Sequence, residues 1–194
     1  MKLLVTVLFV FTALAEMAFI AHGQEVRPAT EQKVFSNSPF QHPVALSPKV
    51  LKVLLAAHPA KETFAVLNDS EKANPSQLFQ AGEVRLSGAD EVDLIVTGMG
   101  RMRGTENSWF WVVRSARKDP ELILFSGGDS LEVLDTKTHG YRDIRAVWMS
   151  SLGTETTTYH FDGHSYQMRN ADNFKILVNP TSPYLRALVV QGDI

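Results

Sequence analysis

Seven short segments rich in aromatic and branched aliphatic residues follow one another between residues 83 and 161. They are Glu83–Leu86, Val92–Thr97, Trp109–Arg114, Glu121–Phe125, Leu131–Leu134, Tyr141–Met149 and Glu155–Phe161. Turn signals separate or follow them, among them Gly127-Gly128, His139-Gly140 and Asp162-Gly163. Parallel strands need longer crossovers than these connections provide, so the pattern predicts a meander of antiparallel strands.

One helix is predicted before the strands. Ser47 is a capping residue, and Pro48 suits the first helical position. Apolar residues follow at helical spacing, and Pro59 ends the segment; they are Val50, Leu51, Leu54 and Leu55. The predicted fold class is α+β: an antiparallel β-meander with one N-terminal helix packed on the sheet, forming a domain over residues 47–170.

Two flanking regions complete the predicted organisation. Residues 24–46 are rich in proline and serine and are expected to form an extended N-terminal arm. Residues 171–194 are expected to form a C-terminal strand pair that completes or covers the sheet, from the apolar runs Phe174–Val178 and Leu185–Val190. With 194 residues, of which 44% are hydrophobic and 21% charged, the chain is long enough for one globular domain with a core.

The first 23 residues have the composition of a signal peptide. Lys2 is followed by an almost unbroken apolar run, and Ala21-His22-Gly23 carries small residues where a signal peptidase cuts, which predicts a mature start at Gln24. Cleavage after Ala15 and retention as an anchor are the alternatives, although Glu16 interrupts the run before it reaches the length of a spanning helix. The predicted location is extracytoplasmic, periplasmic or secreted, without stable membrane insertion after signal removal.

Composition excludes several functional classes. The net charge of −2 provides no basic surplus for nucleic-acid binding. The absence of cysteine excludes disulfides, cysteine catalysis and thiolate metal sites. No cofactor and no metal site are predicted. Trp109, Trp111 and Trp148 suit a sugar-stacking platform in principle, but core packing is the favoured interpretation.

The segment Gly98–Gly104 is the best candidate for a binding site. Its glycine spacing resembles a phosphate cradle, but the following residues are strand-like, whereas such cradles open a helix. Its arginine and methionine side chains are types that suit protein contact surfaces. We therefore predict a contact loop formed by Arg101, Met102 and Arg103, with a mobile solvated loop as the alternative.

Catalytic and metal-binding patterns are weak. His160, Asp162 and His164 would share one face of a continuous strand, but the turn signal Asp162-Gly163 predicts a hairpin with surface histidines instead. No Gly-x-Ser-x-Gly motif is present, so no catalytic residue is assigned. The acidic residues of the sheet region are interpreted as turn and surface residues; they are Glu91, Asp93, Asp129 and Asp143.

Four segments carry a family resemblance over residues 83–169. They are Val92–Gly98, Phe110–Val113, Gly140–Ile144 and Phe161–Tyr166. Together they resemble a group of exported bacterial proteins of unknown function related to FG-GAP, propeller-blade-like sequences. The aspartate-rich calcium loop of FG-GAP repeats is not kept, because only Gly88 and Asp93 match it. The resemblance implies a scaffold and no reaction.

The sequence therefore predicts an exported soluble protein, most simply a non-catalytic binding or accessory protein of the cell envelope. Its partner would be another envelope or secreted protein. One alternative is an extracytoplasmic hydrolase that brings together His139, Asp143, His160 and Asp162. Another is an inhibitor or immunity protein that blocks a secreted hydrolase.

Overall fold

The computed structural model describes residues 31–88, 91–105, 107–115, 119–151 and 153–175, with side chains described up to residue 169. The helical elements are α1 Pro48–Ala56, α2 Ala60–Ala65, α3 Asp69–Lys72, η1 Pro75–Leu78 and η2 Gly100–Met102. The strands are β1 Val34–Ser36, β2 Pro43–Val44, β3 Phe79–Val84, β4 Asp93–Gly98, β5 Ser108–Arg114, β6 Glu121–Gly128, β7 Ser130–Thr138, β8 Tyr141–Ser150, β9 Gly153–Phe161 and β10 Tyr166–Lys175.

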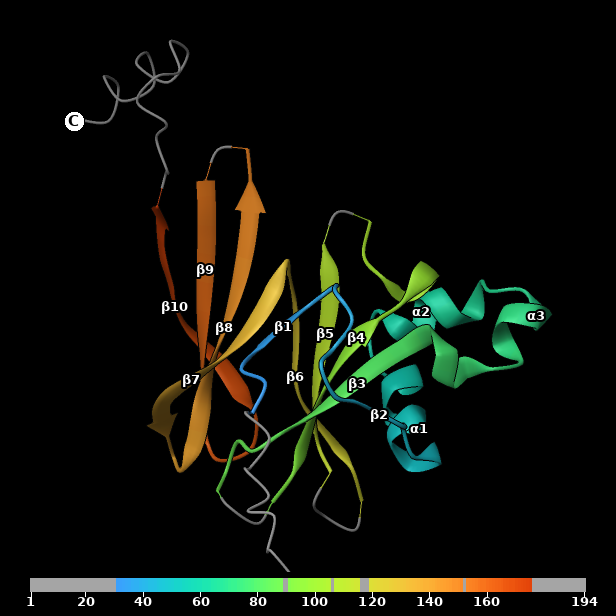
Figure 1. Ribbon diagram of the computed structural model, residues 1–194, viewed down its shortest axis with the longest axis horizontal. Coiled ribbons are helices and arrows are strands. Elements are labelled where there is room, and N and C mark those ends of the chain that lie inside the picture. Colours follow the sequence, from blue (N-terminus) through green and yellow to red (C-terminus); the bar gives the residue numbers. More distant parts are fainter. Residues whose placement is uncertain (1–30, 89–90, 106, 116–118, 152, 176–194) are drawn as a thin grey trace, which may run out of the picture. The chain divides into compact units, whose positions relative to one another are not determined.

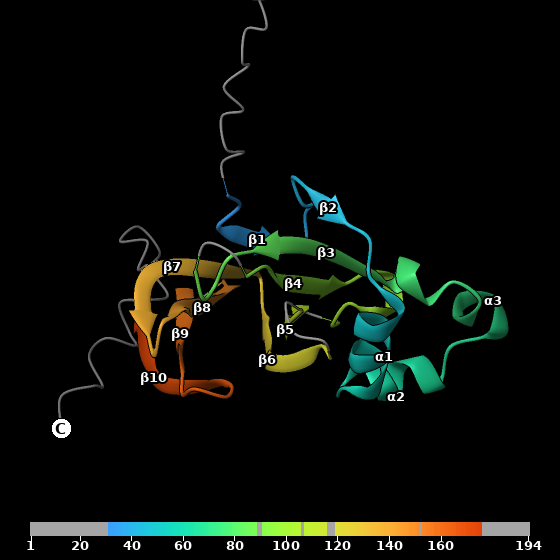
Figure 2. The same cartoon turned by 90° about the horizontal axis from the view of Figure 1, so that it is seen from below.

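The described strands form two antiparallel sheets. One has the order β1-β7-β8-β9-β10 and the other the order β2-β3-β4-β5-β6. Figures 1 and 2 show the second sheet between the first sheet and the helices α1 to α3. The antiparallel pairing predicted from the short connections is confirmed, and the protein is predominantly β. The single meander is wrong, because the strands divide into two sheets, and the single helix is wrong, because α2 and α3 follow α1.

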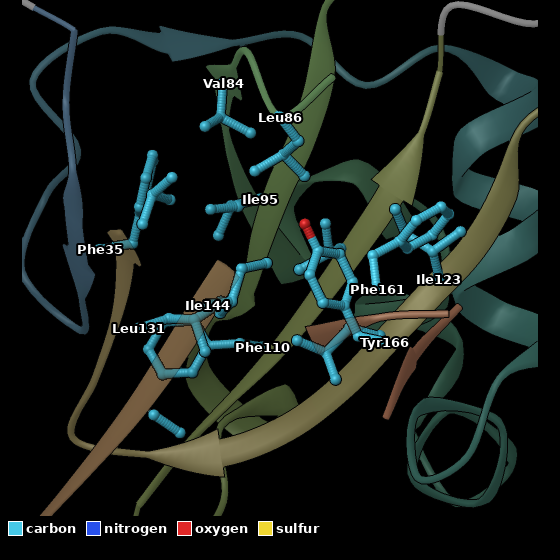
Figure 3. Packing of buried hydrophobic residues seen from close by; sticks show 14 of the residues in the cluster. Phe35, Val84, Leu86, Ile95, Phe110, Ile123, Leu131, Ile144, Phe161 and Tyr166 are labelled. Atoms are coloured by element: carbon cyan, nitrogen blue, oxygen red, sulfur yellow. The ribbon is translucent and has the colours of Figure 1, made fainter. Parts of the chain in front are cut away.

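A continuous apolar core lies between the two sheets. Phe110 and Ile95 from the second sheet, with Leu131 and Ile144 from the first, are fully buried there. Figure 3 shows side chains from both sheets pointing into this common space. Short alternating strands therefore bury one face of each sheet against the other.

The other face of the second sheet is covered by helices. Ser47 caps α1 by accepting a hydrogen bond from the Val50 amide at 3.3 Å, and Pro48 stands at the first helical position, as predicted. Val50 and Leu54 of α1 pack with Trp111 in a second buried cluster. Phe110 and Trp111 thus point to opposite faces of β5, and core packing accounts for the fully buried Trp111.

The chain passes from one sheet to the other at the end of β6. Gly127 and Gly128, predicted as a turn, are the last residues of this strand, and Asp129 alone separates β6 from β7. A Cβ atom on Gly127 would lie 2.7 Å from the Trp148 ring, so a side chain there would displace the tryptophan. The Asp129 amide donates to the Val147 carbonyl at 2.7 Å, which ties the crossing point to β8.

The two flanking regions contribute to the sheets where they are described. Within the predicted arm, β1 pairs with β7 and β2 pairs with β3, because Phe35 and Phe40 are buried in the inter-sheet core. At the other end, β10 begins at Tyr166, eight residues before the predicted strand start at Phe174. The predicted strand Leu185–Val190 lies outside the described residues, as does the predicted signal peptide. No helix within the described ranges has the length and apolar character needed to span a bilayer.

Candidate contact loop and buried polar cluster

The predicted contact loop is held by its backbone and by one buried side chain. Met102 N donates to Met99 O at 2.9 Å, and Met99 N donates to Leu78 O at 2.8 Å. Gly98 permits the close approach, since a Cβ atom there would lie 2.0 Å from Met102 O. Met102 is fully buried among the residues that pack under α1 and α2. It therefore anchors the loop. Of the three predicted contact residues, only Arg101 and Arg103 are left to contact a partner.

Arg101 and Arg103 are both exposed. Arg101 Nη1 lies 3.4 Å from Glu71 Oε2, an oxygen that also accepts the Asn68 amide at 3.0 Å. The Asn68 side chain accepts the Glu71 amide in return, which completes a capping box at the start of α3. The exposed Arg101–Glu71 pair contributes little stability, so a carboxylate of a partner can compete for this guanidinium.

Two of the four residues in the predicted hydrolase site meet. His160 Nδ1 lies 3.1 Å from Asp143 Oδ1 and 2.9 Å from Thr138 Oγ1. The Asp143 side chain is buried and that of His160 is largely so. With Asp143 as a carboxylate, which only accepts hydrogen bonds, this contact corresponds to the His160 tautomer that carries its proton on Nδ1 and leaves Nε2 as the acceptor. A hydroxyl nucleophile would have to be hydrogen-bonded to Nε2, whereas the Thr138 hydroxyl is hydrogen-bonded to Nδ1.

His139 and Asp162, the other two residues of the predicted hydrolase site, make hydrogen bonds in turns. His139, at φ 50°, directs Nδ1 to the Phe161 carbonyl at 2.8 Å. The Asp162 carboxylate accepts the amides of His164 and Ser165, both at 2.8 Å, so the predicted turn at Asp162-Gly163 is confirmed. These backbone hydrogen bonds lower the pKa of Asp162. In the described parts of the chain, no group of three or more histidine or acidic side chains is arranged to hold a metal.

A buried polar cluster was not predicted. The interpretation of Asp93 and Asp143 as surface residues is wrong, since 0% and 2% of their surfaces are exposed. Asp93 starts β4 and faces the inter-sheet core on the same side as Ile95. Both Asp93 carboxylate oxygens are buried without a hydrogen-bond partner among the described residues. A buried carboxylate in this state disfavours its own ionised form.

Arg114 lies beside Asp93 and bonds elsewhere. The register that pairs Leu94 with Val113 places Arg114, the last residue of β5, next to Asp93. The Arg114 Nη2 group is bound to Glu121 of β6, while its Nε atom is buried and unpaired within the described structure. The Arg114 guanidinium lies 5.9 Å from the centre of the Phe161 ring. Arg114 thus lies between a buried carboxylate and a half-exposed one.

Burial sets the acid–base properties of this cluster. Burial first, and then the neighbouring Glu91 carboxylate, raise the pKa of Asp93 from 3.8 to about 6, against the smaller opposing effects of the Ser115 amide and Arg114. Burial likewise raises the pKa of Tyr166, whose hydroxyl donates to the Arg142 carbonyl at 2.6 Å. No local pattern marked this cluster, because its members come from β4, β5, β6, β8 and β10.

Comparison with known proteins gives no relative from which a function could be transferred. Neither a family model, nor a curated protein, nor a solved structure matches the chain. The functional argument therefore rests on the chain's own residues.

Proposed function

We propose that the protein is an exported, non-catalytic binding or accessory protein of the cell envelope, with Arg101 and Arg103 as its contact residues. The supporting observation is the anchored loop: two exposed arginines flank Met102, which is fully buried. Export is proposed from the composition of residues 1–23.

An anchored loop favours binding for an energetic reason. Association requires that loops and side chains become ordered, and each group that is already fixed reduces this cost. The backbone of the loop is fixed by hydrogen bonds to Leu78 and within η2. Arginine is enriched at protein interfaces and bonds carboxylates through two parallel N–H donors. The expected partner is therefore an envelope or secreted protein that presents carboxylates.

A comparative pull-down tests the proposal. The purified protein is immobilised and exposed to envelope and secreted fractions, beside an Arg101→Ala, Arg103→Ala variant. Lys137→Ala, Arg169→Ala is the matched control, because it also removes two exposed positive charges, from β7 and β10. A partner kept by the wild type and the control, and lost by the loop variant, supports the proposal. Equal retention by all three contradicts the assigned surface.

A hydrolase is the second candidate, because His160 and Asp143 form a histidine–carboxylate pair. The described residues place no hydroxyl at Nε2, which argues for a structural role in the β8–β9 region. A screen with ester, amide and glycoside substrates distinguishes the two. Turnover by the wild type that disappears in His160→Ala would replace the binding proposal. If the captured partner is itself a secreted hydrolase, its inhibition by the protein would identify an inhibitor or immunity protein.

A further inference from the structure

Two complementary polar groups lie next to each other between the sheets without bonding. The Asp93 oxygens are acceptors and Arg114 Nε–H is a donor. Neither makes a hydrogen bond of standard geometry within the described structure, although the Ser115 amide lies close enough to favour the Asp93 carboxylate. Asp93 is fully buried and Arg114 is 3% exposed. A buried charged group that lacks a partner is costly, so the arrangement is suited to a neutral Asp93.

Arg114 lies between two carboxylates, one on each neighbouring strand. On β6 it is paired in register with Glu121, whose side chain is 52% exposed, and on β4 it neighbours Asp93. Water can solvate Glu121 when Arg114 leaves, but it cannot solvate the buried Asp93. Once Asp93 is ionised, the Arg114 guanidinium therefore stabilises Asp93 more than it stabilises Glu121.

The other charged groups around Asp93 strengthen this dependence. Glu91 precedes it in the same segment and opposes ionisation. Tyr166 of β10 approaches Asp93 from the first sheet and is also influenced by the Asp143 carboxylate. Tyr141 interacts with both Tyr166 and Arg114. Arg142, the other buried arginine nearby, is bound to the Leu134 carbonyl and to Asp135. Arg114 is thus the cation positioned to compensate an ionised Asp93.

We propose that Asp93 and Arg114 form a proton-controlled switch: Arg114 binds Glu121 while Asp93 is protonated, and turns to Asp93 when this carboxyl group releases its proton to solvent. This exchange would break the ion pair between Arg114 and Glu121, which are the last residue pair of the β5–β6 ladder. The adjoining residues Ser115 and Pro120 line a pocket of about 310 Å³ beside Lys49 of α1. A change in the protonation of Asp93 would therefore affect the residues that line this pocket.

Nuclear magnetic resonance can follow the exchange directly. The Nε–H signal of Arg114, assigned by its loss in Arg114→Lys, is recorded from pH 4.5 to 8 together with the carboxyl carbon of Asp93. We expect both signals to titrate together with a midpoint near pH 6. Relative to an exposed arginine at the same pH, hydrogen exchange of Nε–H should slow by at least about tenfold above the midpoint, because this N–H then donates a hydrogen bond to the Asp93 carboxylate.

Two variants make the test specific. Asp93→Asn should abolish the titration of the Arg114 signal. Glu121→Gln removes the competing carboxylate at the surface, so the acidity of Asp93 should increase by about tenfold, which is one unit of pH. An Arg114 signal that stays constant while Asp93 titrates would overturn the switch. So would an Asp93 carboxyl that does not titrate in this range, or a Glu121→Gln protein with an unchanged midpoint.

Discussion

Arg101 on η2 and Glu71 on α3 are joined through one oxygen, since Glu71 Oε2 accepts both the Arg101 guanidinium and the Asn68 amide. The contact links the loop that carries the proposed binding surface to the capping box of a neighbouring helix. Glutamine at position 71 preserves the capping geometry without the charge, whereas alanine removes both.

The ion-pair and capping contributions of Glu71 to the free energy of unfolding can therefore be measured separately. We expect Glu71→Gln to lower the free energy of unfolding by less than about 0.5 kcal/mol, because an exposed ion pair contributes little. Glu71→Ala should cost about 1 kcal/mol, because it also removes a cap. Urea denaturation of both variants checks this. Equal losses would mean that the capping interaction has no measurable effect.

Met102 should be a main source of loop order. Its side chain is fully buried, so Met102→Ala should lower the free energy of unfolding by about 3 kcal/mol through lost packing and the cavity left behind. The matched control is Met168→Ala, since the Met168 side chain is exposed and its loss should change stability by less than about 0.5 kcal/mol. Similar denaturation midpoints for the two variants would refute the anchoring role.

Asp93 should make the protein less stable as the pH rises. Its pKa is about 6 in the folded protein and near 3.8 when unfolded, so the folded state holds a proton that the unfolded state releases. The contribution of Asp93 to stability is therefore greatest below about pH 4 and declines as the pH rises through 6. The wild type should lose up to about 3 kcal/mol over this range from this group.

Replacing Asp93 with asparagine should remove that decline. At pH 7 Asp93→Asn is expected to be more stable than the wild type by up to about 3 kcal/mol, and near pH 4 the difference should almost vanish. Urea denaturation at several pH values measures both. A variant that is less stable than the wild type at pH 7 would show that ionised Asp93 is stabilised by its surroundings.

The proposed export predicts a defined amino terminus. The protein recovered from outside the cytoplasm should begin at Gln24, because Ala21 and Gly23 stand at the positions a signal peptidase reads. Intact-mass measurement distinguishes this from cleavage after Ala15. A protein that retains Met1 in the membrane fraction would instead support an uncleaved anchor.

Local patterns predicted β4 to β9 and α1 well, for a physical reason, whereas β3 begins at Phe79, four residues before the predicted start at Glu83. Alternation along Tyr141–Met149 reports which face of a strand is buried, and Ser47-Pro48 encodes a helix start within two residues. Both features act over a few neighbours in the chain. The structure accordingly confirms β8 at Tyr141–Ser150 and α1 at Pro48–Ala56.

The division into two sheets and the buried cluster depend on contacts between distant segments. Gly127-Gly128 permits either a tight hairpin or a crossing between sheets, and the choice depends on Trp148 and Val147, which lie about twenty residues further along. Asp93 follows a polar stretch and looks like a surface residue. It becomes buried because β5 and β10 bring Arg114 and Tyr166 to it.

The most direct test of the central claim is quantitative capture of an envelope or secreted partner by three forms of the protein. The account predicts that wild type and Lys137→Ala, Arg169→Ala retain the same partner. The folded Arg101→Ala, Arg103→Ala variant should bind it at least about tenfold more weakly, as expected when interface arginines are removed. Undiminished capture by the loop variant, or specific capture by none of the three, would contradict a binding function centred on this loop.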